Sequence, residues 1–102
     1  MAKGYWIARM DVHDQDAYKT YLSLNGKAFA KFGARFLARA GTHEAVEGTA
    51  RARNVIIEFP SYRAALDCYR SPEYADAMAA RTSASEGELL IIEGYEGTQP
   101  GD

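Results

Sequence analysis

Cysteine is almost absent from this 102-residue sequence, whose single thiol belongs to Cys68. One cysteine excludes an intramolecular disulfide and fits a reducing compartment such as the cytoplasm. No apolar run approaches the roughly 20 residues that a membrane-spanning helix needs, and the N-terminal segment lacks the apolar core of a signal peptide. These absences lead us to expect a cytoplasmic protein that has no membrane partner.

Basic charge and metal ligands are also scarce. The 12 Lys and Arg residues are outnumbered by 14 Asp and Glu, so the net charge of −2 offers no electrostatic attraction for nucleic acid. His13, His43 and Cys68 lack the spacing of a metal site. No glycine-rich turn of the kind that holds a phosphate or a dinucleotide links a strand to a helix. We therefore expect no nucleic acid, no metal ion and no cofactor.

The composition of the sequence indicates one globular domain. The sequence is 47% hydrophobic and 25% charged, which is typical of a folded protein with a single core. Gly97, Pro100 and Gly101 gather at the C-terminal end, where chains are often loosely held. We expect one ferredoxin-like domain over residues 1–96 and a flexible tail over residues 97–102.

Strand and helix signals alternate along this domain. Residues 41–53 have the composition of a long hairpin, in which Val46 is a candidate for a short strand. Apolar and β-branched runs predict strands over residues 5–12, 35–40, 54–59 and 88–93. Helical periodicity and capping residues predict helices over residues 17–32, over residues 62–69 and onward from Ser71.

The resulting order is β-α-β-β-α-β, the α+β arrangement of ferredoxin-like folds with an antiparallel sheet. In such a fold the helices cover only one face of the sheet. Val55 and Ile57 supply apolar side chains to one face. The last strand is apolar on both faces, with Leu89 and Ile91 on one side and Leu90 and Ile92 on the other. Because strands of this kind are usually covered on both sides, we expect a homodimer joined through the sheet faces.

Several strings resemble a known family of small bacterial proteins. The most specific are Glu58-Phe59-Pro60-Ser61 and Tyr69-Arg70-Ser71-Pro72-Glu73-Tyr74. From about Tyr5 to Gly94 the sequence resembles the family called domain of unknown function 1330, of the dimeric α+β barrel superfamily. The resemblance implies two ferredoxin-like subunits whose sheets meet face to face, and it implies no established reaction. Ala40 departs from the family, which usually has glycine there.

Arg39 and Glu58 are the leading site candidates, because each is a charged residue inside an otherwise apolar strand. Ionised side chains are rarely buried without a partner. The two residues therefore either form an ion pair that helps to fix the register and the dimer, or line a pocket for an anionic or carbonyl-bearing ligand. Arginine is the better anchor, since its planar guanidinium matches a carboxylate.

Three further residues are weaker candidates for ligand binding. His43 follows the second strand and can exchange protons near neutral pH, although a loop histidine exposed to solvent is the simpler interpretation. Tyr69 and Tyr74 flank Ser71, where a helix begins and presents backbone amides. Core packing is the more usual role of such rings.

Three functions follow from these candidates. The first is a small-molecule-binding protein with a pocket near Arg39, Glu58 and Tyr69. The second is a cofactor-independent enzyme of the monooxygenase or isomerase type, in which Arg39 orients an oxyanion and His43 or Glu58 moves a proton; this rests on fold-level analogy. The third is an interaction module whose dimer is the whole function.

Overall fold

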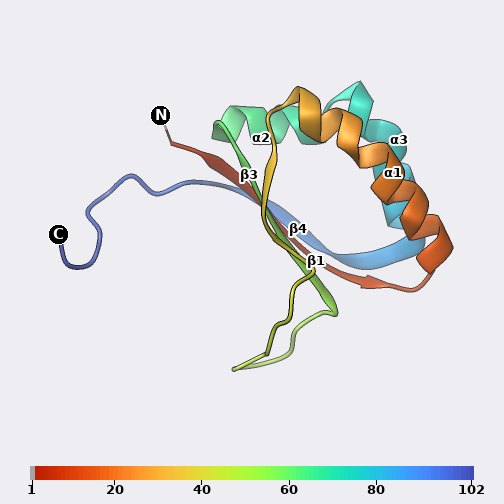
Figure 1. Ribbon diagram of the computed structural model, residues 1–102, viewed down its shortest axis with the longest axis horizontal. Helices are drawn as coiled ribbons and strands as arrows, with labels where there is room; N and C mark the ends of the chain where they lie inside the picture. The colour runs from red at the N-terminus through yellow and green to blue at the C-terminus, as the bar shows by residue number, and fades with distance from the viewer. Residues whose placement is uncertain (1) are drawn as a thin grey trace.

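The computed structural model describes residues 2–102, which form four strands and three helices (Figure 1). The β-α-β-β-α-β order is confirmed, and its second helical region is divided in two, as the restart at Ser71 predicts. In chain order the elements are β1 (Gly4–Val12), α1 (Gln15–Lys31), β2 (Arg35–Arg39), β3 (Arg53–Phe59), α2 (Tyr62–Tyr69), α3 (Pro72–Ala84) and β4 (Ser85–Glu93).

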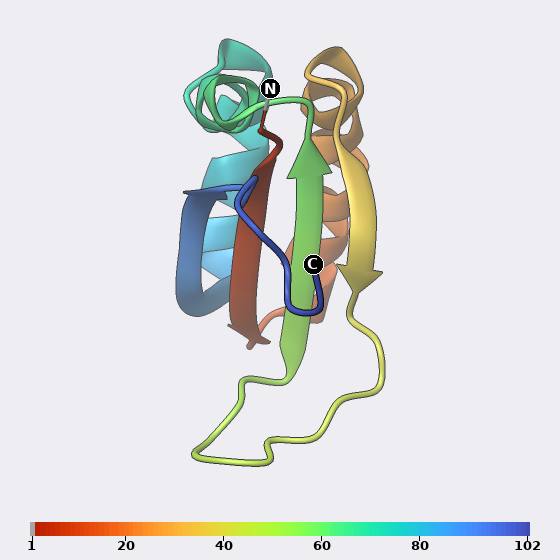
Figure 2. The same ribbon diagram turned by 90° about the vertical axis from the view of Figure 1, so that its left-hand side faces the viewer.

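The sheet has the strand order β2-β3-β1-β4, and every neighbouring pair is antiparallel. All three helices cover one face, here called the helix face, and no helix of the described chain lies on the other, the bare face (Figures 1 and 2). Two segments project away from the helices: the arm, residues 40–52, which joins β2 to β3, and the tail, residues 94–102 (Figure 1).

Each helical region begins at a polar side chain that caps it. Asp14, Ser61 and Ser71 each accept a hydrogen bond from the backbone amide three residues later, at 3.0, 3.0 and 3.2 Å respectively. Such caps satisfy amides that the helix itself leaves unpaired. Pro72 occupies the first position of α3, where its missing N–H is not needed.

Trp6 is the centre of the core between the sheet and the helices. Its side chain is only 1% exposed, and its ring lies 5.3 Å from Phe29, 5.3 Å from Phe59 and 5.1 Å from Tyr74, measured between ring centroids. The indole Nε1 donates a hydrogen bond to the Ala65 carbonyl at 2.9 Å. This cluster joins β1 to α1, β3, α2 and α3.

Leu37 is an extra residue in the pairing of β2 with β3. Four residues apart on a regular strand, Arg35 and Arg39 would lie on the same face. A bulge changes the face of every residue beyond it, so Arg35 lies on the bare face and Arg39 on the helix face. The pairs on either side of the bulge are Arg35 with Glu58 and Phe36 with Ile57, then Ala38 with Ile56 and Arg39 with Val55.

Ala40, directly after β2, has a backbone φ of 54°. This left-handed conformation disfavours side chains with a Cβ and is adopted most easily by glycine. The family's preference for glycine at this position therefore has a conformational reason, and alanine here adopts the same turn at a cost. The turn leads the chain from β2 into the arm.

Two details of the predicted elements were wrong. The arm forms no short strand around Val46, which is 80% exposed, because no other strand lies beside it. β4 begins at Ser85 rather than at residue 88, because α3 leads directly into the strand and Gly87 already pairs with Met10 of β1. Gly87 is thus a strand residue and not a turn before the strand.

Arg51 holds the end of the arm against the sheet. Its guanidinium forms ion pairs with Asp11 at 2.7 Å and with Glu88 at 2.6 Å. Asp11 also accepts a hydrogen bond from the Ala52 amide at 3.0 Å. This backbone hydrogen bond and the guanidinium lower the pKa of Asp11, and the guanidinium lowers the pKa of Glu88. Both carboxylates therefore stay ionised and keep the ends of β1 and β4 connected to the arm.

The bare face carries a row of apolar side chains across all four strands. Ala38, Ile56, Ile7 and Leu90 are successive partners from β2 to β4. Leu90 is 52% exposed and Ile56 is 37% exposed, and Ile92 on the same face is 49% exposed. An apolar row of this kind in contact with water is unusual for an isolated domain.

Candidate functional site

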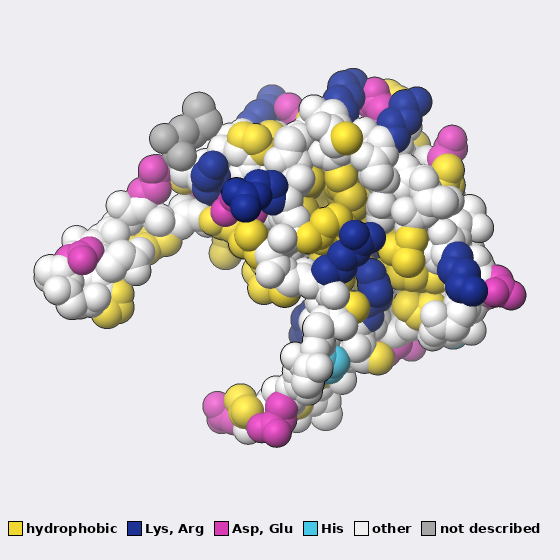
Figure 3. Space-filling view, viewed as in Figure 1, with side chains coloured by type: hydrophobic (Ala, Val, Ile, Leu, Met, Phe, Trp, Pro, Cys, Tyr) yellow, Lys and Arg dark blue, Asp and Glu magenta, His cyan; other side chains and the backbone are white. Residues whose placement is uncertain are grey.

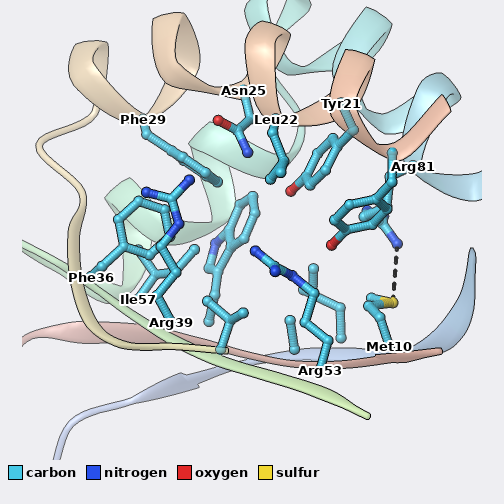
Figure 4. Close-up of a pocket in the computed structure, with 15 residues that line it drawn as sticks. Met10, Tyr21, Leu22, Asn25, Phe29, Phe36, Arg39, Arg53, Ile57 and Arg81 are labelled. Carbon is cyan, nitrogen blue, oxygen red and sulfur yellow. Dashed lines mark hydrogen bonds between the residues drawn. The ribbon is translucent and has the colours of Figure 1, made fainter. Parts of the chain in front are cut away.

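A small cavity lies between the helix face of the sheet and helices α1 and α3 (Figure 4). Its volume is about 20 Å³, enough for a single water molecule. The sheet contributes an apolar floor that includes Trp6, Val55 and Ile57. Three arginines also line it, Arg39 from β2, Arg53 from β3 and Arg81 from α3. Its lining, drawn from residues 2–102, includes no aspartate or glutamate.

Arg39 reaches this cavity because of the bulge at Leu37. Its guanidinium carbon lies 4.1 Å from the centre of the Phe36 ring, a cation–π contact within one strand. Figure 4 shows both side chains turned toward the space below α1. A guanidinium that lies on a ring keeps the N–H groups of its edge available, so Arg39 can still bind an acceptor in its plane.

Arg53 is a site residue that the sequence analysis missed. Its guanidinium carbon lies 5.2 Å from the centre of the Tyr18 ring, and its Nε is buried without a hydrogen-bond partner among the described residues. The alternation along β3 could have identified it, because Arg53 is two residues before Val55 and four before Ile57, both core residues. A cation in phase with core side chains must point under the helices.

Arg81 is only 9% exposed and has no carboxylate partner among the ion pairs of residues 2–102. Its Nε donates to the Tyr74 hydroxyl at 3.3 Å, and Nη1 lies 4.0 Å from the sulfur of Met10. The Tyr74 and Tyr21 hydroxyls are 2.9 Å apart. Burial raises the pKa of Tyr21 far above its ordinary value, so this hydroxyl stays protonated at the cavity wall.

Basic and apolar groups also occur together at the surface near the cavity. Figure 3 shows Lys and Arg side chains gathered between α1 and the arm, with hydrophobic side chains around them. A positively charged rim over an apolar interior attracts small anions and holds their uncharged parts. The surface above the cavity is therefore suited to the approach of an organic anion.

Glu58 does not join Arg39, because the two side chains lie on opposite faces of the sheet. Glu58 is on the bare face, where it accepts a hydrogen bond from the Tyr5 hydroxyl at 3.2 Å. The ion pair that the sequence left open is thus not formed. The alternation of β3 assigns Glu58 to the face opposite Ile57, and the bulge assigns Arg39 to the face of Ile57.

The other three candidates lie outside the cavity lining. His43 is on the exposed arm, and its Nδ1 lies 3.0 Å from the Gly41 carbonyl oxygen. Tyr69 packs edge-on against Trp6 at 5.9 Å, in the core. Tyr74 is completely buried behind the lining, where its hydroxyl bonds to Tyr21 and Arg81 and its ring packs against Trp6.

The described residues form neither a reactive cysteine site nor a metal-binding cluster. Cys68 is fully buried, and burial raises the pKa of its thiol to about 12, so it stays protonated. Within residues 2–102, no three His, Cys, Asp or Glu side chains come together in a group that could hold a metal ion. None of the helices in this part of the chain is both long enough and apolar enough to cross a membrane.

Solved structures share this fold at low sequence identity. RPA0582, a protein of unknown function from Rhodopseudomonas palustris, superimposes with a TM-score of 0.76 and 17% identity, covering 94% of this chain and 85% of its own. SnoaB, a cofactor-independent oxygenase from Streptomyces nogalater, gives a TM-score of 0.64 and 16% identity, covering 98% of this chain and 99% of its own. At such identities the likeness concerns the fold alone.

Sequence comparison gives a more direct result. No curated protein matches the chain. The model of one protein family does match, and its match extends over residues 3–95, which include every element of the fold and every arginine of the cavity. The chain therefore belongs to the family described as Domain of unknown function (DUF1330).

Proposed function

We propose that this protein binds a small organic anion at the mouth of the arginine-lined cavity between the helix face and helices α1 and α3. The observation that carries the proposal is the set of three cavity arginines, Arg39, Arg53 and Arg81, without an acidic residue in the lining. Arg81 is buried and Arg53 is half-buried, and charged side chains in such positions are ordinarily paired with an opposite charge. Here rings, hydroxyls and a sulfur contact the guanidiniums. An anionic ligand would supply the missing charge.

The same geometry favours binding over the two other functions considered. An enzyme that moves protons needs a group whose pKa is close to neutral pH, whereas Tyr21 is held protonated and His43 lies on the arm. A pure interaction module would cover its unpaired charges with the partner subunit. Arg39 instead faces the helices, on the side opposite the exposed apolar row of the sheet.

Replacing Arg39 with alanine is expected to weaken the binding of a small anion by about a hundredfold, because truncating a charged hydrogen-bonding partner costs several kcal/mol. Isothermal titration with benzoate, acetate and inorganic phosphate measures the effect. Arg39 is exposed at the cavity edge, so the variant is expected to fold normally. The matched control is Arg63→Ala, which removes an exposed arginine from α2 that is 3.6 Å from Asp67 and outside the cavity.

Two outcomes of this titration contradict the proposal. One is that none of the three anions binds to the unmodified protein. The other is that Arg39→Ala binds the best of them as tightly as Arg63→Ala does. In both cases the cavity arginines would have a purely structural role.

We further propose that the protein is a cytoplasmic homodimer in which the bare faces of two subunits meet. The apolar row Ala38, Ile56, Ile7 and Leu90 supplies the contact surface that a stable dimer needs. The arm and the tail project on either side of that face and would border a second subunit (Figure 1). A buried, unpaired Cys68 suits the reducing cytoplasm.

Leu90→Asp is expected to convert the dimer to a monomer, since it places a charge in the middle of the apolar row. Size-exclusion chromatography with light scattering measures the mass of both forms. Leu24→Asp is the control, because Leu24 is an exposed leucine on α1, 39% accessible and on the opposite side of the sheet. A monomeric unmodified protein, or a dimer that survives Leu90→Asp, would show that the sheet faces do not meet.

A further inference from the structure

A second, larger cavity adjoins the one that the arginines line. Its volume is about 380 Å³, within the range of small-molecule sites. It lies between the first turns of α1, the end of β1 and the two ends of the arm, with Val12, Leu22, Ala40 and Ala52 among its apolar lining residues. No acidic side chain of the described residues lines it.

The two cavities meet at Arg53. Arg53, Tyr18 and Leu22 line both of them, so the contact of the Arg53 guanidinium with the Tyr18 ring forms part of the wall between them. The Nε–H of Arg53 is buried there without an acceptor. A buried N–H that lacks a partner is costly, and such groups commonly mark a place where a ligand or water completes the bonding.

We infer that the ligand is a carboxylate with an extended apolar body, bound with its carboxylate on Arg53 and Arg39 and its body in the larger cavity. This inference rests on the proposed anion binding and assigns the class of anion. The inner space of about 20 Å³ has room for about one water molecule, so the body of a ligand must occupy the larger cavity. A carboxylate also matches the planar edge of a guanidinium. The apolar residues Val12, Leu22, Ala40 and Ala52 of the larger cavity offer contacts for the uncharged body of such a ligand.

The orientation follows from the position of the polar groups. Lys19 and Gln15 of α1 are exposed at the larger cavity, so the body of the ligand extends from Arg53 past Leu22 toward solvent. Ala52 lies on the opposite wall, and its backbone is held by the hydrogen bond to Asp11. A larger side chain at Ala52 would therefore occupy the space of the ligand's body and leave the arginines unchanged.

The experiment compares 4-phenylbutyrate, its uncharged amide and acetate by isothermal titration. We expect 4-phenylbutyrate to bind at least about tenfold more tightly than acetate, since its body fills the apolar cavity. The amide is expected to bind about a hundredfold more weakly than the acid, since it has no negative charge to form an ion pair with the guanidiniums. Ala52→Phe should weaken 4-phenylbutyrate by about tenfold while acetate binds as before. Ala79→Phe, at an exposed position of α3 outside both cavities, should change neither.

The outcomes separate this inference from the proposed function. If the amide binds as well as the acid, if inorganic phosphate binds more tightly than both carboxylates, or if Ala52→Phe leaves 4-phenylbutyrate unaffected, the assignment of the ligand class is overturned while anion binding stands. If no anion binds, or if Arg39→Ala binds anions as tightly as the unmodified protein does, both the ligand class and the proposed anion binding are contradicted. Unchanged acetate binding by Ala52→Phe also shows that this variant is folded.

Discussion

Replacement of Trp6 by alanine is expected to lower the free energy of unfolding by about 3–5 kcal/mol, the largest loss of any single substitution considered for this chain. The indole is 1% exposed and contacts rings from four other elements, including Phe29 and Tyr74. Its removal would leave a cavity and would remove the hydrogen bond to the Ala65 carbonyl. Because domains of this size are stable by only about 5–15 kcal/mol, much of the stability would be lost. Urea denaturation followed by circular dichroism measures the change.

Trp6→Phe is the matched control for this prediction. Phenylalanine keeps an aromatic ring in the cluster and removes the N–H that binds the Ala65 carbonyl. We expect a loss of about 1–3 kcal/mol, from the lost hydrogen bond and the smaller ring in the core. If Trp6→Ala costs no more than Trp6→Phe, the aromatic cluster is not the centre of the core.

Gly87→Ala is expected to destabilise the protein by about 1–3 kcal/mol, even though alanine is normally a mild substitution. A Cβ at Gly87 would overlap the carbonyl oxygen of Arg9 on the neighbouring strand and lie 2.8 Å from the Met10 sulfur. A backbone carbonyl cannot rotate away as a side chain can, so β1 and β4 would have to separate where α3 turns into the sheet. The same denaturation experiment gives the magnitude.

Gly26→Ala is expected to have the opposite effect on stability and serves as the control. Gly26 lies inside α1, and a Cβ there would meet nothing within 4 Å. Alanine should stabilise the helix by roughly 0.5–1 kcal/mol, because glycine has more conformational freedom to lose on folding. Equal effects at Gly26 and Gly87 would contradict the close approach of β1 and β4.

Features that depend on neighbours in sequence could be predicted from the sequence. The caps at Asp14, Ser61 and Ser71 involve the next three residues only, and each begins a helix as expected. The order of strands and helices follows from the same short-range signals. The first residue of β4 could not be predicted in this way, because it depends on which residues of β1 pair with the strand.

The candidate site could be predicted only in part, because it depends on the pairing of β2 with β3. An arm of 13 residues, from residue 40 to residue 52, separates these strands, so no short turn determines their register. Arg39 could be recognised as a charge in an apolar strand, but the face it occupies depends on the bulge at Leu37. Arg53 was missed because the sequence assigned residues 41–53 to the hairpin, whereas β3 begins at Arg53.

The bulge at Leu37 also bears on how proteins of this fold can diverge. Loss of one residue from this strand would return the basic group at its end to the opposite side of the sheet, with every side chain chemically unchanged. An insertion or deletion can therefore move a cation out of the ligand cavity as effectively as a substitution can remove it. Alignments that treat a single gap in this strand as neutral would group together proteins with different ligands.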